Sequence, residues 1–343
     1  MIELRSDTFT LPTPAMLHAM VSAPLGDDVY GEDPTVRTLE ERSAVTLGKE
    51  AGCLMPSGTM ANLAAIMAQT PRGGRVMVGD ESDIYCYEAG GASVCGGAVY
   101  APLPTQADGR VDLTDLARPF DDDPDDPQFA PPALLCLENT HNRCGGAVLP
   151  LDYLTEVGRF AAVHGVAFHL DGARVFNAAV ALGVPVADVA EAADTVQFCL
   201  SKGLAAPIGS MVVGSAEVVG RIRRIRKMLG GGMRQAGIIA AAGLVALDEF
   251  PERLSADHAN ARRLAEGLAS LPGLKVHPVS TNIILFDVLD ERYTWQGFIA
   301  AANEAGVRLS ELGHGRVRAV THSGVSAGDV DRALEALSGV LEG

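Results

Sequence analysis

The sequence has no surplus of positive charge. Its 343 residues include 27 lysines and arginines against 43 aspartates and glutamates, which gives a formal net charge of −16. Nucleic acids and phospholipid surfaces are bound through basic patches, so this balance argues against both as partners. The one basic run, residues 221–227, carries isoleucines at helical spacing and predicts an amphipathic helix with a solvated face.

Long apolar runs and cysteine pairs are missing as well. The longest apolar run, residues 236–247, is too short to cross a bilayer, and no basic and apolar leader opens the chain. We therefore expect a cytoplasmic protein. The cysteines show no C-x-x-C pair and no histidine at metal-ligand spacing, so we predict free thiols and no metal site. The six are Cys53, Cys86, Cys95, Cys136, Cys144 and Cys199.

The chain does contain a regular alternation of short apolar runs and helical periodicity, from about residue 35 to residue 215. Short apolar runs predict strands, and the stretches between them, such as residues 59–69 and 153–164, predict helices. This alternation indicates an α/β domain with a mostly parallel sheet buried on both faces. The predicted strands are residues 52–56, 75–79, 97–103, 133–138, 166–173, 195–200 and 209–214.

A second unit follows a long apolar helical stretch that runs through residue 247. Its pattern predicts a small α+β domain with helices at residues 256–271, 295–305 and 327–341 and strands at residues 282–288 and 316–322. We therefore divide the chain into a large domain, residues 1–248, and a small C-terminal domain, residues 249–343. The proline- and aspartate-rich segment 119–132 is predicted to be a solvated loop rather than a metal site.

One lysine, Lys202, interrupts an otherwise uncharged stretch, residues 196–209. Lysine seldom lies in such surroundings without reaching water, and a side chain that extends to the surface is the simpler interpretation. The other is a lysine whose amine forms a Schiff base with a carbonyl compound, in a site that lowers its pKa. The lysine alone does not decide between these two.

Asp171 follows a predicted buried strand, about one βα unit before Lys202. Open α/β sheets bind ligands at the carboxyl ends of their strands. An aspartate there, with a lysine one unit later, fits a pyridoxal-phosphate (PLP) site in which the carboxylate pairs with the pyridinium nitrogen. A helix N-cap is the alternative for Asp171, but a cap does not account for Lys202 or for Arg174 nearby.

A third cluster of small residues, Ser57, Gly58 and Thr59, comes directly before a predicted helix. Hydroxyl groups and free backbone N–H groups at a helix N-terminus form an anion site. A plain N-cap is the equal alternative. The spacing is not that of a P-loop, so a nucleotide is not the expected ligand.

Motifs along nearly the whole chain resemble those of the low-specificity L-threonine aldolases, PLP enzymes of fold type I, the aspartate aminotransferase-like group. Motifs of this length are more specific than any single spacing, so the three separate signals above support one another. The matching segments are LRSDTFT (4–10), GDDVYGEDPTV (26–36), PSGTMAN (56–62), ENTHN (138–142), HLDGAR (169–174), CLSKGLAAPIGS (199–210), RKMLGGGMRQAG (226–237) and RVRAVTH (316–322).

The resemblance implies a role for each matched residue. Lys202 would bond covalently to PLP, Asp171 would hold the pyridinium nitrogen, and Arg174 would lie by the phenolic oxygen. The phosphate would be held by Ser57, Gly58 and Thr59.

The resemblance also implies substrate contacts and a shared site. Ser6 and Arg318 would bind the substrate carboxylate, for which a planar guanidinium is well suited. Lys227 and Arg234 would reach the cofactor phosphate of a neighbouring subunit, in a homotetramer built from two dimers. Further residues that would line the pocket are Tyr30, Glu88 and His141.

The implied reaction is the cleavage of L-threonine, L-allo-threonine and related β-hydroxy amino acids to glycine and an aldehyde. His141 suits the base that takes the β-hydroxyl proton, and a bound water is the alternative. A related fold-type I enzyme, a β-eliminating lyase or an aldehyde-transferring transaldolase, would share Lys202 and Asp171 and differ in the fate of Cβ. A binding or regulatory module is a third class, against which the intact Lys202 argues.

Two positions depart from the family's pattern. Asp83 stands where the family usually has a histidine that stacks on the cofactor ring, and Gly324 stands where it usually has an aspartate. An aspartate does not stack as an aromatic ring does, and its charge shifts nearby pKa values. Asp83 is therefore a further catalytic candidate. Either Tyr85 or Tyr87 compensates for the change, or the substrate, the Cβ stereochemistry or the outcome at Cβ is altered.

Overall fold

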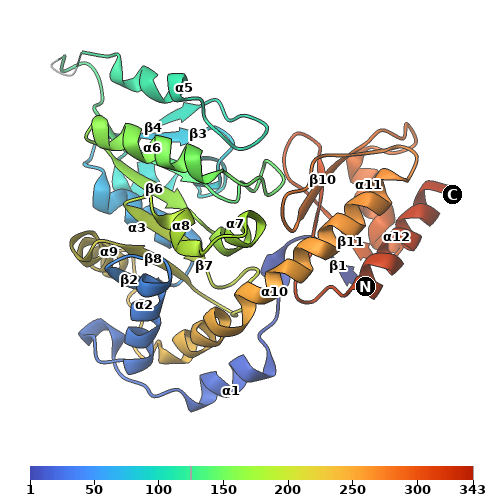
Figure 1. The fold of residues 1–343 in the computed structure, drawn as a ribbon, viewed down its shortest axis with the longest axis horizontal. Helices are drawn as coiled ribbons and strands as arrows, with labels where there is room; N and C mark the ends of the chain where they lie inside the picture. The colour runs from blue at the N-terminus through green and yellow to red at the C-terminus, as the bar shows by residue number, and fades with distance from the viewer. Residues whose placement is uncertain (124–125, 343) are drawn as a thin grey trace.

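The computed structural model describes residues 1–123 and 126–342. Its larger part is built around a seven-stranded sheet, drawn on the left of Figure 1. Every predicted strand of this sheet is confirmed, and the sheet is parallel except at β8, which runs antiparallel to both of its neighbours. In spatial order the strands are β2 (Ala51–Met55), β8 (Ser210–Gly214), β7 (Thr195–Cys199), β6 (Ala167–Asp171), β5 (Pro132–Glu138), β3 (Arg75–Gly79) and β4 (Val99–Leu103).

Both faces of the sheet are buried, as the apolar runs predict. Alternate residues of one strand enter different hydrophobic clusters: Cys53 and Met55 pack with α3 (Gly58–Gln69) and α9 (Ala216–Met228), whereas Leu54 enters the cluster on the other face. That other cluster includes residues of α1 (Pro14–Ser22), α2 (Pro34–Thr46), α6 (Leu151–Val163), α7 (Val175–Leu182) and α8 (Val186–Ala190). Shorter elements are α4 (Asp83–Cys86), α5 (Leu113–Ala117) and the 3-10 helices Asp7–Phe9, Asp28–Tyr30 and Arg118–Phe120.

The basic run 221–227 lies on α9, as predicted, but its face is not wholly solvated. Arg226 is 2% exposed and its Nη2 lies 2.8 Å from Oδ2 of Asp28, and Arg223 pairs with Glu40. A buried guanidinium needs such a partner because an unpaired charge is costly away from water.

The smaller part is an antiparallel four-stranded sheet in the order β12 (Ser310–Glu311), β13 (Val317–Val320), β10 (Ile283–Val288) and β9 (Leu274–Val276). The helices α11 (Trp295–Glu304) and α12 (Ala327–Glu342) pack with it, so two of the predicted helices and both predicted strands of the second unit are confirmed. The N-terminal strand β1 (Ile2–Glu3) pairs with β11 (Val307–Arg308), and Leu4 is buried in the core of this smaller part.

One long helix, α10 (Gly237–Ala269), joins the two parts and crosses the centre of Figure 1. The prediction of two separate helices, ending at residue 247 and starting at residue 256, is wrong because the helix continues through Pro251. The predicted domain boundary at residue 248 falls inside this helix.

Of the proline- and aspartate-rich segment 119–132, positions 124 and 125 lie outside the described residues. The rest has no helix or strand between Phe120 and Pro132, where β5 begins. Within the described residues, no helix has the length and apolar character needed to cross a membrane. No cluster of three or more His, Cys, Asp or Glu side chains there is arranged to hold a metal ion. All six cysteines are free thiols.

Candidate active site

Three polar residues meet at one edge of the large sheet, where adjacent parallel strands end. Glu138 closes β5 and is paired with Asp171, which closes β6; Asp171 is paired in turn with Gln197 of β7. Lys202 follows three residues after the end of β7. A cavity of about 370 Å³ opens at this edge, the usual ligand site of such a sheet. The predicted residues that line it are Ser57, Gly58, Thr59, Asp83, Glu88, Asp171 and Lys202.

Lys202 is held by its backbone. Its carbonyl oxygen accepts hydrogen bonds from Oγ1 of Thr10 at 3.0 Å and from the N–H of Ala205 at 2.9 Å. Ala205 has φ 61°, the left-handed region that alanine seldom adopts, so this turn is strained. Strain at a position that directs the lysine into the cavity is typical of functional sites.

The pKa of Lys202 is raised, contrary to the expectation that the site lowers it. Burial lowers this pKa, but the acidic groups Cys199, Asp83 and Asp7 more than offset that effect. The amine is therefore kept as an ammonium group by its acidic neighbours.

Asp171 is anchored to the neighbouring helix by Asn62. The two N–H bonds of the Asn62 amide serve two acids: Nδ2 lies 2.8 Å from Oδ2 of Asp171 and 2.8 Å from Oε1 of Glu88. Burial raises the pKa of Glu88 to about 9, with Asp171 adding to the effect. Burial raises the pKa of Asp171 as well. Glu88 is protonated at neutral pH, which reduces repulsion across the shared amide.

A buried histidine, His169, orients the side-chain amide of Asn62. His169, with none of its surface exposed, has Nε2 3.0 Å from Oδ1 of Asn62 and Nδ1 2.8 Å from Oγ1 of Thr195. Because Asn62 offers an acceptor there, Nε2 carries the hydrogen and Nδ1 accepts from the threonine. Burial lowers the pKa of His169 to about 4, so this neutral form persists. The chain Thr195, His169, Asn62 therefore fixes the carboxylate of Asp171.

The N-terminus of α3 faces the same cavity. Oγ of Ser57 caps the helix by accepting a hydrogen bond from the N–H of Met60 at 3.2 Å, so the N-cap interpretation holds together with the cavity position. A Cβ on Gly58 would lie 2.9 Å from Sγ of Cys199, which shows how closely this backbone approaches β7. Free N–H groups here suit an anion. Among the residues that line the cavity, Lys202 is the only lysine or arginine.

Arg174 is paired with an acid that the sequence did not single out. Its Nε and Nη2 each lie 2.7 Å from an oxygen of Asp7, and both residues are 5% exposed or less. Burial would raise the pKa of Asp7, but Arg174 outweighs burial and lowers it. Ser6, beside Asp7, accepts a hydrogen bond from the N–H of Thr8 at 3.2 Å and is 8% exposed.

Among the described residues, Arg318 on β13 has no acidic partner. Its hydrogen bonds go to Oγ of Ser310 at 3.3 Å, Oδ1 of Asn142 at 2.9 Å and the carbonyl of Arg5 at 2.9 Å. Burial lowers the pKa of Arg318 to about 10, and the positive charge of Arg174 adds to that effect. Such a group gains most when a carboxylate binds it.

Asp83 is in the cavity, whereas His141 is not among the residues that line it. The carboxylate of Asp83 accepts from Nδ2 of Asn142, and its N–H donates to Oε2 of Glu138 at 2.7 Å. His141 is 2% exposed, its ring lies against Gly109 and its buried Nδ1 has no hydrogen-bond partner. Burial lowers the pKa of His141 to about 4, so its imidazole is neutral at pH 7.

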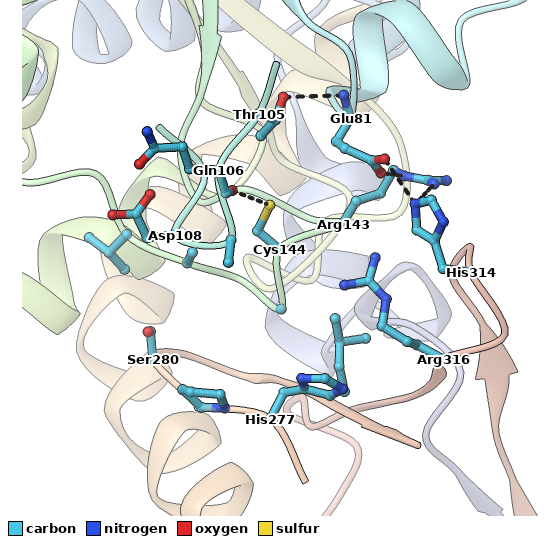
Figure 2. A pocket seen from close by; sticks show the side chains of 16 residues that line it. Glu81, Thr105, Gln106, Asp108, Arg143, Cys144, His277, Ser280, His314 and Arg316 are labelled. Carbon is cyan, nitrogen blue, oxygen red and sulfur yellow. Dashed lines mark hydrogen bonds and ion pairs between the residues drawn. The ribbon is translucent and has the colours of Figure 1, made fainter. Parts of the chain in front are cut away.

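A second cleft, of about 480 Å³, lies between the two parts of the chain. Figure 2 shows Glu81, Arg143 and His314 converging at its rim. Nε of Arg143 lies 2.5 Å from Oε2 of Glu81, and Nε2 of His314 lies 2.8 Å from Oε1 of the same acid. Arg143 also donates to the hydroxyl of Tyr87, a residue that lines the first cavity. This cluster therefore connects the rim of the cleft to Tyr87 in the wall of the first cavity.

Three predicted residues lie away from the Lys202 cavity. Tyr30 is 76% exposed, Arg234 lies over its ring at 5.9 Å and pairs with Asp27 at 3.0 Å, and Lys227 is an exposed residue of α9. None of the three lines the cavity of its own chain, and Ser6, Arg174 and Arg318 are not among the residues that line it either.

Sequence reasoning missed two buried amides, Asn62 and Asn142, and two buried acids, Glu138 and Asp7. Asn62 and Asn142 were inside recognised motifs, and Glu138 ends a predicted strand beside Asp171. An uncharged amide gives no distinctive signal in the sequence. Only the strand register places Glu138 beside Asp171, at the edge of the sheet where the cavity opens. A search for polar residues at all carboxyl strand ends would have found Glu138.

The chain matches the family model described as beta-eliminating lyase over residues 3–291. It is 45% identical over 326 residues to the low specificity L-threonine aldolase of Escherichia coli K12, which covers 95% of each chain. Among solved structures it resembles the Leishmania major threonine aldolase (TM-score 0.83, 19% identity, 99% and 100% covered). It also resembles a structure of SPT with a PLP internal aldimine (TM-score 0.77, 18% identity, 99% and 87% covered).

The structural likenesses confirm the fold expected for the large and small parts, and the full-length sequence match confirms the resemblance read from the motifs. The chain therefore belongs to the beta-eliminating lyase family and, within it, to the low-specificity L-threonine aldolases.

Proposed function

We propose that this protein is a PLP-dependent aldolase that cleaves L-threonine, L-allo-threonine and related β-hydroxy amino acids to glycine and an aldehyde. The observation that carries the proposal is the convergence of Lys202, Asp171 and the N-terminus of α3 on one cavity. A family relative 45% identical over 326 residues, a low specificity L-threonine aldolase, supports the reaction class.

The residues around the cavity fit PLP. Lys202 supplies the amine for the aldehyde carbon, Asp171 a carboxylate for the ring nitrogen, and Ser57, Gly58 and Thr59 an anion cradle for the phosphate. We assign Arg174 to the phenolic oxygen, since its ion pair with Asp7 holds a permanent cation close to Lys202. When bound, PLP supplies an electron sink for the pair released as the Cα–Cβ bond breaks.

Substrate binding is assigned to the small part and the N-terminal segment. Arg318 has no acidic partner in residues 1–123 and 126–342 and would take the substrate carboxylate, with Ser6 as a second donor. Glu88 lines the cavity as a protonated acid, and we assign it no role in the reaction beyond forming the cavity wall.

The β-hydroxyl proton needs an acceptor, and two residues are candidates. Asp83 lines the cavity and offers a carboxylate there. His141 is a neutral imidazole close enough for Asp83 to raise its pKa against burial, and it would act through a bound water. We assign proton transfer to this pair.

We also propose that Tyr30, Lys227 and Arg234 serve the site of a neighbouring subunit, in a tetramer built from two dimers. The residues lining the cavity supply the phosphate site with hydroxyl and N–H donors and no arginine, whereas Arg234 and Lys227 belong to an exposed surface of the chain. A second copy would therefore complete the anion site.

A panel of threo and erythro β-hydroxy amino acids, with glycine and aldehyde quantified, tests the proposal. We expect equimolar glycine and aldehyde from both diastereomers of threonine. A protein that releases ammonia and a 2-oxo acid instead is a β-eliminating lyase, and one that forms a new β-hydroxy amino acid only with an added aldehyde is a transaldolase.

A further inference from the structure

Asn142 lies between two charged groups of the proposed site. Its Oδ1 accepts a hydrogen bond from Nη1 of Arg318 at 2.9 Å, and its Nδ2 lies 3.2 and 3.4 Å from the two oxygens of Asp83. A guanidinium only donates and a carboxylate only accepts, so the amide satisfies both in a single orientation. Asn142 is 7% exposed, which leaves water little access to either contact.

The positions of Asn142 and Asp83 are fixed by one buried acid. Oε1 of Glu138 accepts from the N–H of Asn142 at 2.8 Å, and Oε2 accepts from the N–H of Asp83 at 2.7 Å. Glu138 is 4% exposed and ends β5. The two side chains are therefore set at a fixed spacing by backbone contacts and do not depend on their own hydrogen bonds for it.

The two arginines of the site differ in one respect. Arg174 is neutralised by Asp7 through two hydrogen bonds of 2.7 Å. Within the described part of the chain, Arg318 has only neutral partners: a hydroxyl, an amide and a carbonyl. The carboxylate of Asp83 is separated from Arg318 by the amide of Asn142, which contacts both. The structure thus keeps a half-buried cation and an anion apart although an ion pair would stabilise both.

We propose that Asn142 is a positioning residue that serves as a neutral spacer. It keeps Arg318 free for the carboxylate of the amino acid and keeps Asp83 turned toward the rest of the substrate. The inference rests on the proposed function, because it assumes that an amino acid carboxylate binds Arg318. The class of ligand that it specifies is an α-amino acid whose own carboxylate replaces the absent acidic partner.

Glycine binding to the PLP-loaded protein tests the spacer without turnover, through the change in the visible absorption of the cofactor. Asn142→Asp keeps the side-chain shape and puts a permanent carboxylate on Arg318, so we expect the glycine Kd to rise by about tenfold or more. Asn142→Ala removes the spacer, and we expect a smaller rise because Asp83 then pairs with Arg318. Asn303→Asp, at an exposed position of α11, is the matched control and should leave the Kd unchanged.

Adding Asp83→Asn separates the spacer from a general disturbance of the loop. In the Asn142→Ala background it removes the competing acid, so glycine affinity should recover. In the Asn142→Asp background the carboxylate stays on Arg318, so affinity should stay low. Wild-type affinity in both single variants, or no recovery in Asn142→Ala with Asp83→Asn, overturns the proposal.

The same titration distinguishes failure of the spacer from failure of the proposed function. Wild-type protein that takes up no PLP, or gives no spectral response to glycine, contradicts the proposed function. Wild-type protein that binds glycine but does not cleave threonine contradicts the aldolase reaction alone, and the variant series still decides the role of Asn142.

Discussion

At the scale of single residues, Lys202 is the side chain on which the proposed chemistry depends. It lines the cavity, and its backbone carbonyl, rather than its amine, makes the contacts that hold the turn. We predict that Lys202→Ala abolishes turnover and leaves a folded protein. Circular dichroism and the melting temperature of the apoprotein check this, with Lys275→Ala, at an exposed position, as control. An unfolded Lys202→Ala protein would show that the lysine is structural.

Glu88 gives a prediction about pH. Burial raises its pKa from 4.5 to about 9, so between these values the folded protein holds a proton that the unfolded chain has lost. The contribution of this acid to the free energy of unfolding therefore falls as pH rises, by up to about 1.4 kcal/mol per pH unit. Glu88→Gln, which does not titrate, should be more stable than wild type at about pH 8 and equal to it near pH 4.

Urea unfolding of the two apoproteins across this pH range measures the difference. A stability difference that does not change with pH would mean that Glu88 is already ionised in the folded protein, which contradicts the raised pKa.

The sequence predicted the charged residues of the cavity better than the residues that hold them in place by hydrogen bonds. Lys202 and Asp171 stand out because a charge beside an apolar strand is unusual. Asn62, Asn142 and Glu138 do not stand out, since their importance lies in hydrogen bonds to partners 26 to 176 positions away. Contacts between residues so far apart in the sequence are determined by the fold and leave no local pattern.

At the scale of elements, the N-terminus of α3 carries the proposed phosphate site. A Cβ at Gly58 would lie 2.9 Å from Sγ of Cys199 and 3.0 Å from Nε2 of Gln197, so a larger residue must displace the helix start from β7. We predict that Gly58→Ala weakens PLP binding by about tenfold or more while α3 stays formed, because alanine favours helix.

Equilibrium titration with PLP measures this effect. Gly220→Ala on α9 is the matched control, because nothing lies within 4 Å of its added Cβ. Equal PLP affinity in the two variants would show that α3 does not hold the phosphate.

Most elements could be predicted because their signals are local. The strands of the large sheet are short apolar runs, buried on both faces except at the edge strand β4, and each was found within a few residues of its observed bounds. The single helix α10 could not be predicted, since Pro251 normally ends or bends a helix. Its ends are held by contacts with α1 and α2 in the large part and α12 in the small part, and these long-range contacts outweigh the local preference.

At the scale of the whole molecule, the proposed shared phosphate site needs a second copy of the chain. If Arg234 serves the neighbouring subunit, a mixture of Lys202→Ala and Arg234→Ala proteins forms hybrid dimers with one intact site. Random mixing should then restore about a quarter of the wild-type activity, because half of the dimers are hybrids and half of their sites are intact.

Activity of the mixed and reassembled proteins, compared with each parent alone, tests the shared site. Activity no higher than the average of the two parents would place Arg234 outside the neighbour's site and leave each chain to bind the phosphate by itself.

Cα–Cβ cleavage in the cavity that Lys202 lines is tested by the products formed from L-threonine. Purified protein loaded with PLP is incubated with L-threonine, and all the products are quantified. We expect glycine and acetaldehyde in equal amounts, with neither formed by Lys202→Ala. Release of 2-oxobutanoate and ammonia without glycine would contradict this expectation.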